Sequence, residues 1–195
     1  EPKPGQVKTR LVPALGAQGA AQFAECLLEH AVKQLRMTQV ASKQLCVWPD
    51  AKAKYWQRFE QKISQQVAGD LGDKMSAAAQ QAFAQPGCDG VIFMGMDCPD
   101  LSANVLDQVA LSLADHDVVI VPAKDGGYVC IGIRQLWSAV FEAMPWSQPH
   151  LLKTTLERAK AAGLTAECLD ALVDIDEPED LDFLPRHWMG LVARS

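Results

Sequence analysis

Apolar residues follow two patterns along this chain: short unbroken runs, and longer stretches in which they recur every three or four positions. An unbroken run is typical of a strand whose sheet is covered by helices on both faces. Three runs predict strands of this kind, at residues 91–94, 117–121 and 128–133. Residues 19–37 have helical spacing, and Ser102 can cap a second helix that runs through Leu106 and Leu113. The alternation of the two patterns predicts an α/β fold.

Shorter elements complete this pattern. Two further strands are predicted, at residues 43–48 and 166–172. Four further helices are predicted at residues 51–63, 73–84, 136–144 and 150–162, and the proline- and glycine-bearing residues 1–16 are predicted to be a loop. Asp125-Gly126, between the strands at 117–121 and 128–133, predicts a hairpin. That pair of strands is then antiparallel, and the sheet is mixed.

Composition limits the classes of protein to which the chain can belong. Its 195 residues are expected to form one domain, residues 1–195, with ordinary apolar and charged fractions of 49% and 22%. The net charge of −6 argues against nucleic-acid binding, and no run approaches the ~20 apolar residues of a membrane span. The polar, proline-rich start does not resemble a signal peptide. The six cysteines are scattered singly, as in reduced cytoplasmic proteins, so a cytoplasmic location is expected.

The candidate chemistry begins where the predicted strand 91–94 ends. Asp97 and Asp100 follow that strand, and Pro99 between them fixes the direction in which the chain leaves it. Ligands of open α/β sheets bind just beyond the carboxyl ends of strands. An aspartate at this edge is well placed to hold a divalent cation that carries phosphates, which makes Asp97 the first candidate.

From residue 2 onward, the charged side chains of the N-terminal loop are all basic. Lys3, Lys8 and Arg10 are basic, and no acidic residue lies between positions 2 and 24. A glycine-bearing loop with cations and free backbone N–H groups, leading into a helix, suits a di- or triphosphate. A solvated basic tail explains the same residues equally well. Nucleotide-binding α/β folds usually place a strand directly before such a loop, so either the first strand is missing from this sequence or the assignment of these residues to a phosphate-binding loop is wrong.

A second acidic segment, V-D-I-D-E-P-E-D-L, spans residues 173–181. In extended backbone Asp174 and Asp176 point the same way, and two carboxylates on one face repel unless a cation or a proton lies between them. Asp176 with Glu179 also resembles a capping box, with Pro178 in the first helical turn. Both interpretations hold together if Asp176 caps the last helix while Asp174 reaches a metal ion.

Three further positions have both a structural and a ligand-binding interpretation. Asp70, between two glycines, can cap the helix at 73–84 or contact a ligand. Residues 125–127 are explained by turn chemistry, although their turn lies at the same edge of the sheet as Asp97. Trp146 lies in a loop, where it can stack on a sugar or base, or simply pack.

Four stretches taken together resemble one family. They are P-G-Q-V-K-T-R-L, G-D-L-G-D-K-M, G-M-D-C-P-D-L with P-A-K-D-G-G-Y, and D-I-D-E-P-E-D-L. In this order they resemble an uncharacterised bacterial branch of the nucleotide-diphospho-sugar transferase superfamily, whose members are described as candidate glycosyltransferases. The chain is also similar, more distantly, to phospholactate and molybdenum-cofactor guanylyltransferases. The resemblance implies a three-layer α/β/α, Rossmann-like GT-A fold with a mixed, mostly parallel sheet.

The resemblance also implies roles for individual residues. By it, Gly5, Lys8 and Arg10 bind the nucleotide phosphates, Asp97 binds Mg²⁺ or Mn²⁺ with a second carboxylate from Asp174 or Asp176, and Asp125, Gly126, Gly127 and Tyr128 border the substrate. Together with the residue patterns above, this makes Lys8, Arg10, Asp97 and Asp125 the catalytic candidates, adds Thr9 and Asp70 to the nucleotide-binding candidates, and adds Trp146 to the substrate-binding ones. At one position the sequence departs from the family, because Glu177 stands where relatives often carry threonine.

The expected partners are a nucleotide or nucleotide-diphospho-sugar and a small-molecule acceptor, with assembly into a homodimer left open. A metal ion clamped between carboxylates and phosphates needs no protein nucleophile, and the sequence has no clear nucleophile motif such as G-x-S-x-G. Glycosyl transfer, in which a nucleoside diphosphate leaves a sugar, is the leading expectation. The basic loop favours the alternative, nucleotidylyl transfer from a nucleoside triphosphate to a phosphorylated acceptor with release of pyrophosphate. A non-catalytic nucleotide-binding module on the same scaffold is the third interpretation.

Overall fold

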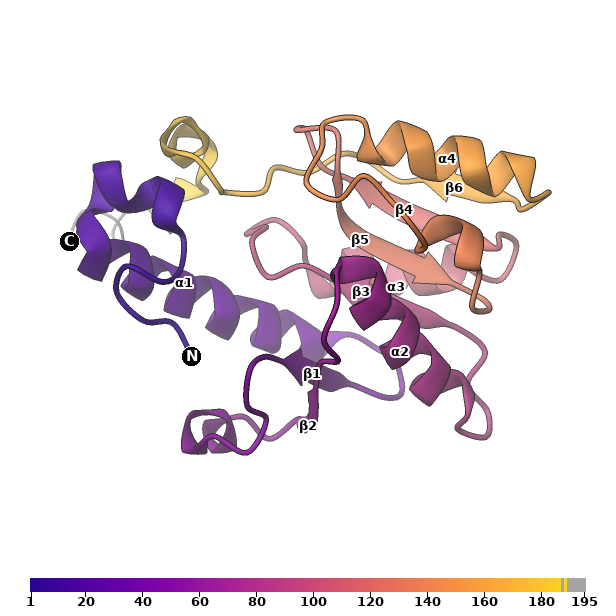
Figure 1. The fold of residues 1–195 in the computed structure, drawn as a ribbon, viewed down its shortest axis with the longest axis horizontal. Coiled ribbons are helices and arrows are strands. Elements are labelled where there is room, and N and C mark those ends of the chain that lie inside the picture. Colours follow the sequence, from indigo (N-terminus) through magenta and orange to yellow (C-terminus); the bar gives the residue numbers. More distant parts are fainter. Residues whose placement is uncertain (187, 189–195) are drawn as a thin grey trace.

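The structure, a computed structural model, describes residues 1–186 and 188. Its main sheet has four strands in the order β3-β5-β4-β6 (Figure 1). These strands are β3 (Val91–Met94), β4 (Val118–Pro122), β5 (Tyr128–Ile133) and β6 (Ala166–Cys168). A second, two-stranded sheet pairs β1 (Gln44–Val47) with β2 (Lys62–Gln65) in parallel. The strands predicted at 91–94, 117–121 and 128–133 are confirmed to within one residue.

The main sheet is mixed, and the expectation of a mostly parallel sheet is wrong. β5 pairs antiparallel with both β3 and β4, whereas β4 and β6 are parallel. The turn at Asp125-Gly126 folds β5 back beside β4, with Ile120 opposite Ile131, and β5 then lies between β4 and β3. Gly126 has a φ of 94°, in the left-handed region that glycine adopts readily. The hairpin that the Asp-Gly pair predicts is therefore confirmed.

Helices cover both faces of the main sheet. α3 (Ala103–Ser112) packs Leu106 and Val109 against a face that includes Val119 and Val121. α2 (Leu71–Phe83) and α4 (Leu151–Ala161) pack against the opposite face, which includes Ile120. Figure 1 shows α4 lying along β4 and β6. All five residues of β4 are buried, as expected for an apolar strand between two helical layers.

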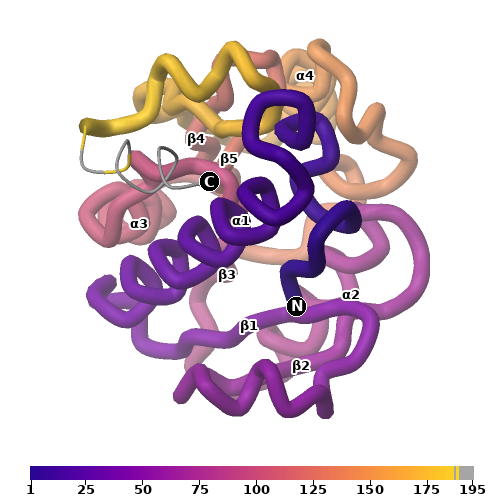
Figure 2. Tube along the Cα trace, turned by 90° about the vertical axis from the view of Figure 1, so that its left-hand side faces the viewer, coloured from indigo at the N-terminus to yellow at the C-terminus, as the bar shows by residue number. Residues whose placement is uncertain are grey.

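α1 (Val12–Met37) brings the N-terminal loop next to the C-terminal segment. Leu11 and Phe23 share one buried cluster with Ile175 and Leu184. Figure 2 shows the first turns of α1 close to the yellow C-terminal segment, and an ion pair between Lys8 and Asp176 joins the two. The loop expected at residues 1–16 is too long, because a short 3-10 helix, η1 (Thr9–Leu11), leads directly into α1, which is kinked at Gly16.

Two of the predicted helices are wrong. Residues 51–63 contain the 3-10 helix η2 (Lys54–Arg58) and the start of β2, because Ile63 pairs beside β1 while Trp56 and Phe59 are buried beneath that sheet. Residues 136–144 contain a single 3-10 turn, η3 (Ser138–Val140). The other predicted helices are present at α1, α2, α3 and α4, and the C-terminal segment contains the 3-10 helix η4 (Pro178–Phe183). No helix within residues 1–186 and 188 combines the length and apolar character needed to cross a membrane.

Candidate active site

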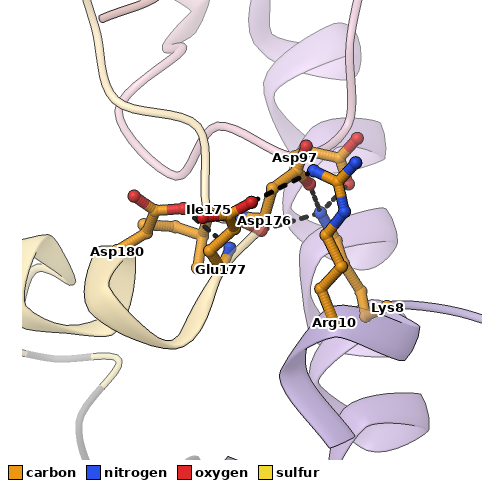
Figure 3. A network of polar contacts seen from close by, with 7 residues as sticks. All are labelled: Lys8, Arg10, Asp97, Ile175, Asp176, Glu177 and Asp180. Carbon is orange, nitrogen blue, oxygen red and sulfur yellow. Dashed lines mark hydrogen bonds and ion pairs between the residues drawn. The ribbon is translucent and has the colours of Figure 1, made fainter. Parts of the chain in front are cut away.

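The ammonium group of Lys8 lies between two carboxylates that come from distant parts of the chain (Figure 3). Its Nζ atom is 2.6 Å from Oδ1 of Asp97 and 2.6 Å from Oδ1 of Asp176. Nζ also donates a hydrogen bond of 2.7 Å to the backbone oxygen of Ile175. The Lys8 side chain is 8% exposed, whereas those of Asp97 and Asp176 are 41% and 46% exposed. An enclosed cation is thus held by two carboxylates that remain partly open to solvent.

Backbone contacts bring these three residues together. Asp97 lies just beyond the end of β3, where Gly95 N–H donates to the backbone oxygen of Val129 at 2.8 Å. Ile175 N–H donates to the backbone oxygen of Asp97 at 2.9 Å, which joins the C-terminal segment to the end of β3. Lys8 has left-handed backbone, with a φ of 45°, and its backbone oxygen accepts from Leu11 N–H at 2.9 Å. The predicted meeting of the cationic loop with the acidic edge of the sheet is present.

The electrostatics of the site favour a charged lysine. Burial lowers the pKa of Lys8, but the charges of Asp97 and Asp176 and their hydrogen bonds raise it by more, so the pKa lies above its usual value. Lys8 is therefore a cation throughout the physiological pH range.

Arg10 lies at the outer side of the same site. Its Nη1 is 3.4 Å from Oε1 of Glu177, and the two side chains are 67% and 58% exposed. Pairs this open to water stabilise a fold little, so Arg10 is available for other anions. Gly5 and Thr9 are also exposed in this N-terminal segment, and Gly5 has a φ of 73°.

The predicted capping box of Asp176 and Glu179 is wrong by one residue. Glu177 is the N-cap of η4, and its capping partner is Asp180. Oδ2 of Asp180 accepts from the backbone N–H groups of Asp176 (3.0 Å) and Glu177 (2.7 Å). Because Glu177 and Asp180 satisfy the start of the helix, the Asp176 carboxylate is free to bind Lys8. Pro178 is in the first turn, as predicted.

Asp174 has a different environment from Asp176. Burial, followed by the charge of Asp125, raises the pKa of Asp174 to about 6. Within residues 1–186 and 188, no three His, Cys, Asp or Glu side chains form a group that could hold a metal ion. The structure therefore brings Asp97 and Asp176 together around Lys8, and it does not gather the expected trio of Asp97, Asp174 and Asp176 into one metal-binding group.

The turn before β5 holds the expected substrate-binding residues in a packed arrangement. Oδ1 of Asp125 accepts from Gly127 N–H at 2.8 Å. A Cβ on Gly126 would lie 1.9 Å from the backbone oxygen of Pro149, so this turn fits closely against the loop before α4. Trp146 meets Tyr128 edge to face, with ring centroids 6.5 Å apart, and both rings are partly buried on the sheet. The packing role of Trp146 is present, while its contact with a ligand stays a prediction.

Asp70 caps α2, as its structural interpretation predicts. Its Oδ1 accepts from Asp73 N–H at 2.9 Å, and Oδ2 of Asp73 accepts from Asp70 N–H at 3.0 Å. This reciprocal pair is a capping box. Asp70 itself is exposed, so a contact with a nucleotide also stays a prediction.

The oxygen atoms around Lys8 Nζ fit a divalent cation. They comprise two carboxylate oxygens and one backbone carbonyl, which are donors that Mg²⁺ and Mn²⁺ prefer, and the positively charged ammonium group shows that a cation is accommodated there. Mg²⁺ commonly takes one or two carboxylates together with substrate phosphates. The Ile175 carbonyl was not predicted, because a backbone oxygen leaves no signal in the sequence. Glu177, the partner of Arg10, was singled out only as a departure from the family.

Comparison with known proteins gives matches over most of the chain. The model of a family described as an uncharacterized protein conserved in bacteria (DUF2064) matches residues 18–148. A solved structure from Desulfovibrio desulfuricans G20, described as a candidate nucleotide-diphospho-sugar transferase, is 31% identical with a TM-score of 0.87. That match covers 96% of this chain and 83% of the other.

Two nucleotidylyltransferases are also similar to this chain. The 2-phospho-L-lactate guanylyltransferase of Methanocorpusculum labreanum is 28% identical over 191 residues, which are 96% of this chain and 82% of the relative. CMP:2-keto-3-deoxy-manno-octonic acid synthetase, solved in complex with CTP, is 13% identical with a TM-score of 0.59. That match covers 84% of this chain and 87% of the other, and at this identity it indicates a shared fold.

Proposed function

This chain belongs to the bacterial family DUF2064, and on that premise we propose that it is a nucleotidylyltransferase, which transfers the nucleotidyl group of a nucleoside triphosphate to a phosphorylated small-molecule acceptor and releases pyrophosphate. The match agrees with the bacterial transferase branch that the four sequence stretches resemble. A chain that resembles transferases over nearly its whole length is expected to use the same edge of the sheet for its substrates.

One observation carries the proposal. Lys8 of the cationic loop lies within 2.6 Å of Asp97, which follows β3, and within 2.6 Å of Asp176. Cationic and acidic groups therefore meet at the carboxyl end of β3, where α/β folds bind their ligands. A nucleotide with its metal ion needs both kinds of group, the acidic ones for the metal and the cationic ones for the phosphates.

Each residue of the site has a role in this reaction. An oxygen of the acceptor phosphate attacks the α-phosphorus, the bond from that phosphorus to the bridging oxygen breaks, and the bonding electrons leave with pyrophosphate. Lys8 and Arg10 neutralise the charge that develops on the leaving pyrophosphate. Asp97 and Asp176 would hold Mg²⁺ or Mn²⁺, which supplies Lewis-acid stabilisation of phosphate oxygens when bound.

Glycosyl transfer, the leading expectation from the sequence, is the less supported of the two reactions. Its support is the description of the Desulfovibrio desulfuricans structure. Nucleotidylyl transfer has the support of a guanylyltransferase that aligns over 96% of this chain and of a fold shared with a CTP-bound synthetase. The cationic loop also favours it, because two basic side chains at the site suit a triphosphate.

The test is pyrophosphate release. The protein is incubated with Mg²⁺, each common nucleoside triphosphate and a panel of phosphorylated acceptors that includes 2-phospholactate, and pyrophosphate is measured by a coupled assay. We expect release that needs both the triphosphate and the acceptor. Parallel reactions with nucleotide-diphospho-sugars measure release of nucleoside diphosphate.

The matched control is Lys153→Met, which removes an exposed lysine of α4 that is paired with Glu157 and lies outside the site. Lys153→Met should keep the wild-type rate, whereas Lys8→Met should lose it. Release of nucleoside diphosphate without any pyrophosphate would replace this proposal by glycosyl transfer. Nucleotide binding without either product would identify a non-catalytic binding module.

A further inference from the structure

The oxygen atoms that suit a divalent cation are the same atoms that bind the Lys8 ammonium group. Oδ1 of Asp97, Oδ1 of Asp176 and the backbone oxygen of Ile175 are 2.6, 2.6 and 2.7 Å from Nζ (Figure 3). A divalent cation bound by these oxygens would lie a little over 2 Å from each. It would occupy the volume that Nζ now fills, so the ammonium group and the metal ion exclude each other.

We propose that Lys8 and the divalent cation compete for one site, so that the metal ion binds only when the Lys8 side chain moves away, and that the phosphates of the incoming nucleotide provide its new partner. The competition follows from the geometry alone. The movement toward phosphate rests on the proposed function, because it needs a substrate that carries phosphates.

Charge balance explains why the exchange takes place with the nucleotide. Two adjacent carboxylates repel each other unless a cation lies between them, and the Lys8 ammonium group supplies that cation in this structure. A metal ion that enters alone must displace an ammonium group that is enclosed and that makes two charge-assisted contacts. A metal ion that enters with phosphates brings a replacement partner for the displaced ammonium group, so the displacement costs less.

The Lys8 side chain is suited to this exchange, and Arg10 is not positioned to replace it. Lysine carries a compact charge on a flexible four-carbon stem, so its ammonium group can change partners without movement of the backbone. Arg10 lies outside the enclosed position, with its guanidinium paired to Glu177 at 3.4 Å. Arg10 can therefore receive phosphates from the start, while Lys8 is released only as the metal ion arrives.

The test measures Mn²⁺ binding with no nucleotide present. Free Mn²⁺ is titrated by electron paramagnetic resonance with the wild type and with Lys8→Met, which keeps the apolar stem and removes the charge. We expect the variant to bind Mn²⁺ at least about tenfold more tightly than the wild type, because a single hydrogen bond between charged groups is worth about that factor. Lys3→Met is the matched control: it removes an exposed charge from the same loop, and it should bind Mn²⁺ as the wild type does.

Two further variants make the result decisive. Asp97→Asn in the Lys8→Met background should abolish the gain, which assigns the bound Mn²⁺ to this site. Lys8→Gln, which keeps a polar end group, repeats the measurement if Lys8→Met does not fold by circular dichroism. Mn²⁺ affinity that is equal to or below that of the wild type in a folded, charge-neutral Lys8 variant would overturn the competition.

The outcome is independent of the reaction that the enzyme catalyses. If the Lys8 variant gains Mn²⁺ affinity but no triphosphate yields pyrophosphate, the competition stands and nucleotidylyl transfer falls. If pyrophosphate is released but the Lys8 variant gains no affinity, the proposed function stands and the competition falls.

Discussion

Asp176 and Asp174 belong to one short segment, but the regions that act on them carry opposite charge. Asp176 binds the ammonium group of Lys8 at 2.6 Å, beside Asp97. Asp174 is influenced mainly by burial and by the negative charge of Asp125, which together raise its pKa to about 6. Asp176 is thus neutralised by a cation, whereas Asp174 is more readily neutralised by a proton.

This difference shows that the chemistry of the segment is set by the parts of the chain that pack beside it. Asp174 and Asp176 have the same side chain and almost the same neighbours in sequence. The loop that contains Lys8 reaches Asp176, and the hairpin turn that contains Asp125 acts on Asp174. We therefore expect substitutions of the two aspartates to change different properties of the protein.

The largest effect is expected for Lys8→Met, which removes the cation from the Asp176 side. Loss of a group that stabilises developing charge should lower the kcat for pyrophosphate release by about a thousandfold. The coupled assay for pyrophosphate measures it, with Lys153→Met as the control. A rate within about tenfold of the wild type would remove Lys8 from the reaction.

A smaller effect is expected for Asp176→Asn, and a smaller one still for Asp174→Asn. Asp176→Asn removes one of the two carboxylates around the cation position and should lower the kcat at saturating Mg²⁺ by about a hundredfold. Asp174→Asn should lower it by less than about tenfold, because Asp174 is not grouped with Asp97 and Asp176 within residues 1–186 and 188. The reverse order in parallel assays would show that the two aspartates have exchanged roles.

The free energy of unfolding should change more for Asp174→Asn than for Asp176→Asn. At neutral pH the negative charge of Asp174 is disfavoured by burial and by the nearby charge of Asp125. The folded protein holds the Asp174 proton up to a pKa of about 6, against 3.8 for an unperturbed aspartate. The stability that this proton contributes is complete below the lower value and is lost as the pH rises through the higher one. Asp174→Asn removes the unfavourable charge and should raise the free energy of unfolding at neutral pH by about 1 kcal/mol, a value reduced for partial exposure of the side chain.

Urea denaturation at several pH values measures this effect. The difference between Asp174→Asn and the wild type should grow between about pH 4 and pH 6 and stay constant above that range. A difference that does not change with pH would mean that the substitution acts through something other than the titration of Asp174.

The smallest effect is expected for Arg10→Met, at the outer side of the site. Arg10 and Glu177 are 67% and 58% exposed, and pairs of this kind contribute little to stability. The substitution should lower the free energy of unfolding by less than about 0.5 kcal/mol in urea denaturation. A loss well above 1 kcal/mol would mean that Arg10, like Lys8, holds the loop to the acidic segment.

The sheet could be predicted from the sequence where local pattern and tertiary packing agree. Residues 118–122 are apolar and completely buried, and Asp125-Gly126 forms the predicted hairpin. The helix predicted at residues 51–63 is wrong, because the strand pairing of Ile63 with Leu45 outweighs the local preference for a helix. The prediction of a mostly parallel sheet is wrong. It rested on the family resemblance, although the predicted hairpin already required an antiparallel pair of strands.

The residues of the candidate site could be predicted from the sequence, but the contacts between them could not. Lys8 and Asp97 were identified from the charge of a loop and from the end of a strand, and the structure places them in contact. The interpretation in which Asp176 caps the last helix is wrong, because the capping box starts at Glu177 and leaves Asp176 to Lys8. Contacts between residues 168 positions apart depend on the whole fold, so no local pattern reveals them.

The hydrogen bond from Ile175 N–H to the backbone oxygen of Asp97 has a consequence for how this site can change. Both of its atoms belong to the main chain, so replacing either side chain leaves the spacing of the two segments intact. The charged side chains can then be changed while the backbone contact between the two segments is kept. Proline at position 175 is the exception, because it has no N–H to donate. Protein engineers can therefore test other ligand-binding side chains in these two segments at an unchanged backbone spacing.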